Sequence, residues 1–77
     1  MDIDEDKVDD TVLALLYLTT FKDEPRLRAW KGHSWDALDR LHRKEYISDP
    51  ATKAKSVLLT EDGAKRSREL FEKYFTK

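Results

Sequence analysis

The side chains of this protein that could do chemistry are few, and their spacing does not favour catalysis. Its two histidines, His33 and His42, each lie three residues from an aspartate, Asp36 or Asp39, and the sequence contains no cysteine. A catalytic metal needs about three protein ligands and an open coordination position, and no third ligand lies at a suitable spacing. Ser34 adjoins His33 but is better explained as a helix cap than as a nucleophile. We therefore expect no enzymatic activity, no cofactor and no bound metal.

A second chemistry, the binding of nucleic-acid phosphates, is suggested by cations in a helix expected at residues 34–44 and in the loop and strand that follow it. Such cations supply most of the non-specific affinity for DNA, and the start of a docked helix lies nearest the base edges. The candidate residues for contacting double-stranded DNA are Ser34, Arg40, Arg43, Lys44, Lys53 and Lys55, with Arg26, Arg28 and Lys31 as second choices.

Two observations weaken DNA binding and keep a protein-interaction role open. Asp36 and Asp39 precede Arg40 and Arg43 by four residues, so local ion pairs are expected to neutralise those cations. The isoelectric point is about 6.1, which is not the strongly basic value typical of a DNA-binding domain. The alternative is an adaptor that binds a second copy of itself, or another protein, through apolar side chains. The candidate self-association residues are Leu13, Tyr17 and Phe21, with Phe75 as a further one.

Length and composition predict one small domain over residues 1–77, since 39% of the 77 residues are apolar and 40% are charged. A chain of this length buries only about 60% of its unfolded surface. Two tryptophans, three tyrosines and three phenylalanines are more aromatic bulk than a small monomer easily hides. No apolar run approaches the length of a membrane span and no secretory signal is visible. We therefore expect a cytoplasmic protein without membrane association.

The charge is unevenly distributed along the chain. Residues 1–25 hold eight acids and two bases, and residues 26–77 hold eight acids and thirteen bases. Residues 1–6 are expected to form a frayed acidic terminus, and the acids that follow suit the positive end of a helix dipole. The spacing of the apolar residues from Val8 to Leu16 predicts that this first helix runs to about Thr20.

The next segments are predicted from the residues that end or begin helices. Residues 19–24 are polar and β-branched and predict a connector. Because proline is well suited to a first helical position, we expect a short second helix from Pro25 to about residue 31. Leu27 and Trp30, three residues apart, would hold it against the core. Trp30 and Trp35 could together line an aromatic ligand site, but core packing is the favoured interpretation of both.

Residues 34–44 predict a third helix, capped by Ser34, with Trp35, Leu38 and Leu41 on its apolar stripe. His42 flanks this stripe, and we expect it to hydrogen-bond to the backbone or to a neighbouring aspartate. Residues 46–47 and 55–59 then predict a two-stranded hairpin with a polar tip at residues 49–54.

Thr60 is predicted to cap a last helix over residues 61–75. Its buried stripe would contain Ala64, Leu70, Phe71 and Tyr74.

Residues 33–75 resemble the second half of winged-helix domains of the MarR and PadR type. The resemblance rests on a helix that contains Leu38 and Leu41, the hairpin after it, and the sequence Leu59-Thr60-Glu61-Asp62-Gly63 that begins the last helix. The runs DDTVLALLYLTTF and RAWKGHSWDALDRLHRK also resemble a small bacterial family of uncharacterised proteins. The resemblance implies a mainly α, winged helix-turn-helix-like fold with one β-hairpin, and a small regulatory module. Such domains commonly have glycine after the third helix, where this chain has Glu45. If residue 45 is left-handed, glycine there should be more stable.

Overall fold

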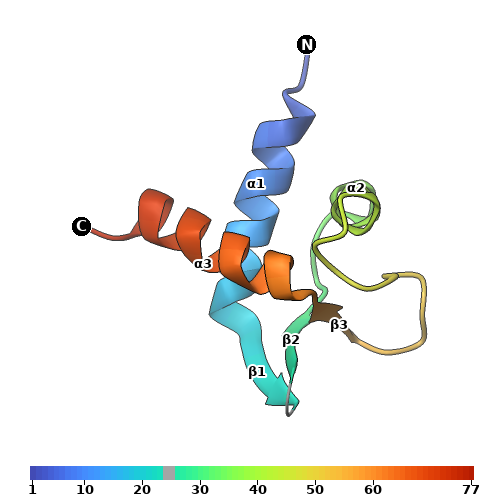
Figure 1. Cartoon of the computed structure of the whole chain (residues 1–77). Helices are drawn as coiled ribbons and strands as arrows, with labels where there is room; N and C mark the ends of the chain where they lie inside the picture. The colour runs from blue at the N-terminus through green and yellow to red at the C-terminus, as the bar shows by residue number, and fades with distance from the viewer. Residues whose placement is uncertain (24–25) are drawn as a thin grey trace.

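The computed structural model describes residues 1–23 and 26–77, and within them three α-helices and three strands form an α+β fold (Figure 1). The elements are α1 (Glu5–Leu16), the 3₁₀ turn η1 (Tyr17–Thr19), β1 (Thr20–Asp23), β2 (Arg26–Trp30), α2 (Trp35–Arg43), β3 (Ser56–Leu59) and α3 (Glu61–Phe75). Figure 1 shows β1 and β2 projecting away from the N-terminal end of α1. The expectations for Glu24 and Pro25, the end of a connector and the first residue of a helix, lie outside the described residues.

The predicted fold class is wrong. The chain is not a mainly α, winged helix-turn-helix-like domain with a two-stranded hairpin, because it contains a three-stranded antiparallel sheet in the order β1-β2-β3. In the register of this sheet, Phe21 lies opposite Arg28, and Ala29 lies opposite Val57. The middle strand, β2, therefore pairs along both of its edges.

The error arises at residues 26–30, which form β2 and not a short helix. Successive side chains of a strand point to opposite faces of the sheet. Leu27 and Ala29 contact the core, so Arg28 and Trp30 face the other way. The predicted helix relied on the spacing between Leu27 and Trp30, and these two side chains lie on opposite faces of β2.

The predicted hairpin is reduced to one isolated bridge, in which Ile47 lies opposite Leu59. Beside it, the Ser48 N–H donates to the Leu58 carbonyl (2.8 Å), and the Leu58 N–H donates to Ser48 Oγ (2.9 Å). β3 is present close to where it was expected, but its long partner is β2. The polar segment at residues 49–55 is irregular and is not the tip of a two-stranded wing.

Helix α1 begins where its sequence favours a start. Asp4 caps it by accepting the Lys7 N–H (3.1 Å), and Glu5 and Asp6 lie in its first turn, at the positive end of the dipole. The helix ends at Leu16, earlier than predicted, because the chain tightens into η1 and then extends into β1.

The positions of the other two helices are confirmed. Ser34 caps α2 by accepting from the Ala37 N–H, and Thr60 caps α3 by accepting from the Gly63 N–H (2.9 Å). Along α3, however, only Leu70 of the predicted apolar stripe is fully buried, and Tyr74 is 43% exposed.

The core is aliphatic, and its fully buried side chains come from all three helices and from the inner face of the sheet. Leu13 and Leu16 of α1 pack with Leu70 of α3, Leu38 of α2 and the inner face of the sheet. The Ser67 Oγ donates to the Leu13 carbonyl (2.7 Å), which ties α3 to α1 inside this core. None of the eight aromatic side chains, all of which lie in the described ranges, is fully buried. The fully buried core therefore contains no aromatic ring, although Tyr46 packs against it.

The junction between α2 and α3 depends on two backbone features. Glu45 has a left-handed φ of 66°. The Glu45 N–H donates to the His42 carbonyl and the Tyr46 N–H to the Leu41 carbonyl (2.9 and 3.0 Å), which is a Schellman motif. The first turn of α3 then sits on this junction, and a Cβ on Gly63 would lie 1.8 Å from the Tyr46 carbonyl oxygen. Glycine at position 63 is thus required by the close approach of two backbone segments.

Candidate functional site

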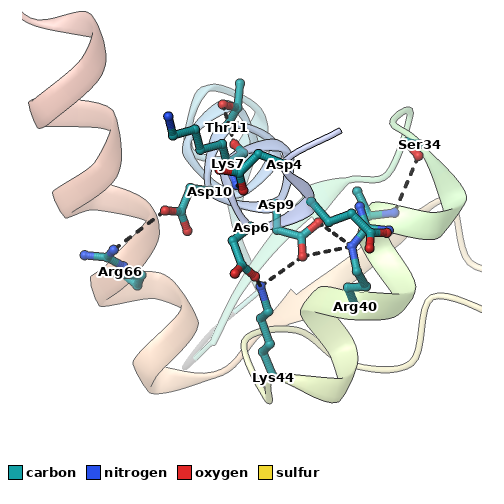
Figure 2. Close-up of polar contacts among 12 residues, drawn as sticks. Asp4, Asp6, Lys7, Asp9, Asp10, Thr11, Ser34, Arg40, Lys44 and Arg66 are labelled. Atoms are coloured by element: carbon teal, nitrogen blue, oxygen red, sulfur yellow. Dashed lines mark hydrogen bonds and ion pairs between the residues drawn. The ribbon is translucent and has the colours of Figure 1, made fainter. Parts of the chain in front are cut away.

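A cluster of charges joins α1 to α2 (Figure 2). Asp9 is fully buried, and both of its carboxylate oxygens accept from Arg40 Nε (2.8 and 3.0 Å), while Lys44 Nζ donates at 2.9 Å. Glu5 accepts from Arg40 Nη1 (2.7 Å) and Asp6 from Lys44 Nζ (3.0 Å). One buried carboxylate on α1 is therefore satisfied by two cations on α2.

The same contacts hold both cations in their charged form. The Asp9 carboxylate raises the pKa of Arg40 above its ordinary value by accepting its hydrogen bonds, and burial opposes this effect. For Lys44, burial is the largest single influence and lowers the pKa. The hydrogen bonds and charges of Asp9 and Asp6 outweigh it, so the net shift is upward. The cluster is an electrostatic clamp between helices and not a proton donor at neutral pH.

This clamp changes the interpretation of the predicted DNA-contacting helix. Among the described residues, Arg40 pairs with Glu5 and Asp9 of α1, and not with Asp36 four residues before it as predicted. Arg40 and Lys44 are thus held by acids of another helix. The other four DNA candidates are the cap residue Ser34 and the exposed residues Arg43, Lys53 and Lys55.

The second-choice cations lie on or beside the sheet. Arg26 is exposed on β2, and Arg28, on the same strand, donates from Nε to Ser56 Oγ (3.1 Å). Lys31 donates to the carbonyls of Pro50 and Thr52 (2.6 and 2.9 Å) and so holds the 49–55 loop in place.

The predicted self-association residues separate in the structure. Leu13 is fully buried in the core and does not lie on the surface of the folded chain. Tyr17 is 37% exposed at the end of α1, and Phe21 is half-buried on β1. Leu13, Tyr17 and Phe21 are four residues apart and would share one row of a continuous α-helix, but the chain leaves α-helical geometry after Leu16.

A surface that we call the aromatic row is formed by Tyr17, Phe71, Tyr74 and Phe75, at the end of α1 and the C-terminal half of α3. The ring centroids of Tyr17 and Phe71 are 4.9 Å apart, those of Phe71 and Phe75 are 5.5 Å apart, and those of Tyr74 and Phe75 are 6.3 Å apart. Phe75 is 48% exposed. Figure 1 shows this end of α3 extending beyond α1.

An open groove lies along α3 from Ala64 to Glu72 and adjoins the aromatic row at Tyr17. It has a volume of about 580 Å³, and its apolar lining comes from Tyr17, Leu27, Leu59 and Ala64. Its rim is charged and contains Lys65, Arg68, Glu69 and Glu72. The Arg68 Nε donates to Glu72 (2.9 Å), and this bond raises the pKa of Arg68.

A second group of aromatic side chains lies on and near the sheet. The rings of Phe21 and Trp30 are 5.0 Å apart, and Lys31 Nζ lies 5.6 Å from the centroid of the Trp35 ring. The prediction that both tryptophans pack in the core is wrong, because Trp30 is 52% exposed and Trp35 is 60% exposed.

Among the described residues, no group of three or more histidines, cysteines, aspartates and glutamates is placed to hold a metal ion. His42 Nδ1 lies 3.1 Å from the Ile47 carbonyl oxygen, which confirms its predicted contact with the backbone. In the described ranges, no helix has both the length and the apolar character needed to cross a membrane.

The sequence did contain a signal for the clamp that was missed. Asp9 falls on the same helical stripe as Val12, Leu13 and Leu16, all of which are buried. A charged residue is almost never buried without a partner. Asp9 therefore required cations from elsewhere in the chain, although its position alone did not indicate which ones.

Comparison with known proteins identifies a family and a relative, but neither has an assigned activity. Residues 4–77 match the family described as a domain of unknown function, DUF6429. The chain is also similar to the uncharacterized protein y4hR of Sinorhizobium fredii (strain NBRC 101917 / NGR234), with 52% identity over 77 residues and all of both chains covered. No solved structure matches it. The expected kinship with a small uncharacterised family is supported, and no similarity to MarR or PadR regulators is shown.

Proposed function

Because the chain belongs to the DUF6429 family, whose description assigns no activity, we propose a function from the geometry alone: a non-catalytic interaction module that binds a second copy of itself through α3. The observation that carries the proposal is the aromatic row, four aromatic side chains in mutual contact outside the core. Partly exposed aromatic rings each offer on the order of 100 Å² for burial. Leu18, which follows Tyr17 in the chain, is 63% exposed and adds apolar surface, and exposed apolar patches mark interaction sites.

The arrangement of α3 favours a second copy as the partner. Ala64, Arg68, Phe71 and Phe75 fall on one stripe of the helix at spacings of four, three and four residues. The groove extends along α3 from Ala64 to Glu72, and the most exposed rings, Tyr74 and Phe75, lie beyond its C-terminal end. A two-fold axis through the middle of α3 places each half opposite the other. Phe75 of each copy then enters the groove of its partner beside Ala64.

The charges along α3 are compatible with the same antiparallel pairing. Glu61 and Asp62 lie in the first turn of α3, and Lys73 lies in its last turn, with Lys77 just beyond. With Phe75 beside Ala64 of the partner, the first-turn acids of one copy face Lys77 of the other, and the two helix dipoles run antiparallel. Phe71 of one copy falls beside Arg68 of the other, which is a cation–π geometry.

The proposal includes no enzymatic step and no binding of duplex DNA by α2. Arg40 and Lys44 would have to leave Asp9, Glu5 and Asp6 before they could meet phosphates. Acids at the start of α1 beside the same helix would repel the DNA backbone.

Sedimentation equilibrium of the full chain tests the proposal. We expect the wild type to form a dimer at tens of micromolar, and Phe75→Asp to remain folded and monomeric at the same concentration. Trp35→Ser removes a comparably exposed ring outside the aromatic row and should leave the dimer intact. A wild type that stays monomeric at several hundred micromolar refutes self-association. A dimer that survives Phe75→Asp refutes this interface.

A further inference from the structure

The face of the sheet that points away from the core is a second, chemically different surface. Phe21, Arg28, Trp30 and Leu58 alternate along their strands with side chains that contact the core, so they share the outer face. Trp30 is more than half exposed, and its ring packs against Phe21 at a centroid distance of 5.0 Å. We call this the outer sheet face, and it is separate from the aromatic row.

We propose that the outer sheet face binds single-stranded nucleic acid, with bases stacked on Trp30 and Phe21 and phosphates bound by Arg26 and Arg28. Single strands are recognised on open sheets by aromatic side chains that stack the bases and by nearby cations that follow the backbone. Both components are present here on two adjacent strands. A duplex keeps its bases stacked inside, so it offers no base for Trp30 to stack on.

The placement of Arg28 supports a binding role for this face. Its side chain is 23% exposed and lies across the sheet, where Nε donates to Ser56 Oγ and is 3.8 Å from Asp23. It is therefore oriented beside the two rings rather than extended into solvent. A preoriented guanidinium loses less freedom on binding a phosphate.

The wider charge distribution also favours a polyanion at this end of the molecule. Lys55, immediately before β3, is exposed, and so is Lys22 on β1, although Lys22 lies opposite Leu27 and therefore points to the other face of the sheet. The acidic start of α1 lies at the opposite end of the molecule from strands β1 and β2 (Figure 1). Asp23, 61% exposed, is the acid next to Arg28, and a phosphate would compete with it for the guanidinium.

Fluorescence anisotropy with labelled twelve-nucleotide oligo(dT) and oligo(U) at low salt measures the binding. We expect dissociation constants on the order of 10⁻⁵ M, and about tenfold weaker binding for Trp30→Ala. Asp23→Asn should bind more tightly than the wild type. Arg28→Gln should bind more weakly and should reduce the slope of log K against log salt by about 0.7, the value for one phosphate of a single strand. The two oligonucleotides separate a DNA ligand from an RNA ligand.

Tryptophan emission locates the site. In Trp35→Phe, Trp30 is the sole tryptophan, and its emission should be quenched as bases stack on it. In Trp30→Phe, Trp35 reports instead and should change little. Equal quenching in both variants, or Trp30→Ala binding as well as the wild type, overturns the proposal, as does the absence of binding at 100 μM protein. The monomeric Phe75→Asp variant should still bind, because its substitution lies outside the outer sheet face.

Discussion

Replacing Glu45 with glycine should stabilise this protein, although the substitution removes a side chain and adds no new contact. Glu45 has a φ of 66°, and its N–H and that of Tyr46 close the C-terminus of α2. For a residue with a Cβ, this left-handed conformation is less stable by roughly 1–2 kcal/mol. Glycine avoids that cost but has a more flexible unfolded chain, which offsets about 0.4–1 kcal/mol. The difference is a net gain in the free energy of unfolding of roughly 0–1.6 kcal/mol, with a central value of about 0.8 kcal/mol.

Thermal unfolding followed by circular dichroism measures this difference. For a domain of 60–100 residues, a gain of 1 kcal/mol raises the melting temperature by roughly 4–8 °C, so Glu45→Gly should melt several degrees above the wild type. Glu45 is exposed and also places a negative charge at the negative end of the α2 dipole. Glu45→Ala is the matched control, because it removes the charge and keeps the Cβ.

The two substitutions together decide whether the backbone is the cause. If Glu45→Ala raises the melting temperature as much as Glu45→Gly does, the gain comes from the lost charge and the conformational argument fails. A Glu45→Gly variant that melts at or below the wild-type temperature would show that the left-handed conformation carries no cost at this site.

Three further predictions concern close approach and charge. Gly63→Ala should destabilise the chain by more than about 2 kcal/mol in urea unfolding, because its Cβ meets the Tyr46 carbonyl, whereas Gly32→Ala, with open space around it, should change stability little. Asp9→Asn should cost about 2–4 kcal/mol, since it leaves two cations without their buried partner. Asp10→Asn loses only a partly exposed pair with Arg66 at 3.9 Å and should cost less than about 1 kcal/mol by the same assay. The raised pKa of Lys44 contributes stability that is complete below the ordinary lysine value of 10.5 and is lost as pH rises through the higher folded value. The wild type should therefore lose more stability above pH 10.5 than Lys44→Gln does, and equal losses would contradict the clamp.

The helices were predictable because their signals are local. A cap residue, an apolar stripe and a favourable dipole lie within one short stretch of chain, as at Ser34 for α2 and at Thr60 for α3. The sheet was not predicted, because pairing depends on residues that are far apart in sequence. β2 pairs with β3, which begins 26 residues after β2 ends. With only five residues in β2, the spacing of Leu27 and Trp30 suited a helix as well as a strand.

The candidate sites were harder to predict, for a related reason. The cations Arg40 and Lys44 were recognised, but whether they face solvent depends on the acids of α1 that lie against them. The same limit applies to Leu13, whose burial depends on α3. Exposure is a property of the assembled fold, so surface roles assigned from one element alone remain open until its neighbours are known.

The bond from Ser67 to Leu13 spans 54 residues, and it marks a core whose two main helices come from opposite ends of the described chain. Such long-range closure has an entropic cost that must be met before the contacts form. During synthesis, α1 leaves the ribosome first and exposes its leucines until α3 is complete. This core therefore cannot close when α1 alone has emerged, and the most aggregation-prone interval of these residues should end only when α3 has emerged.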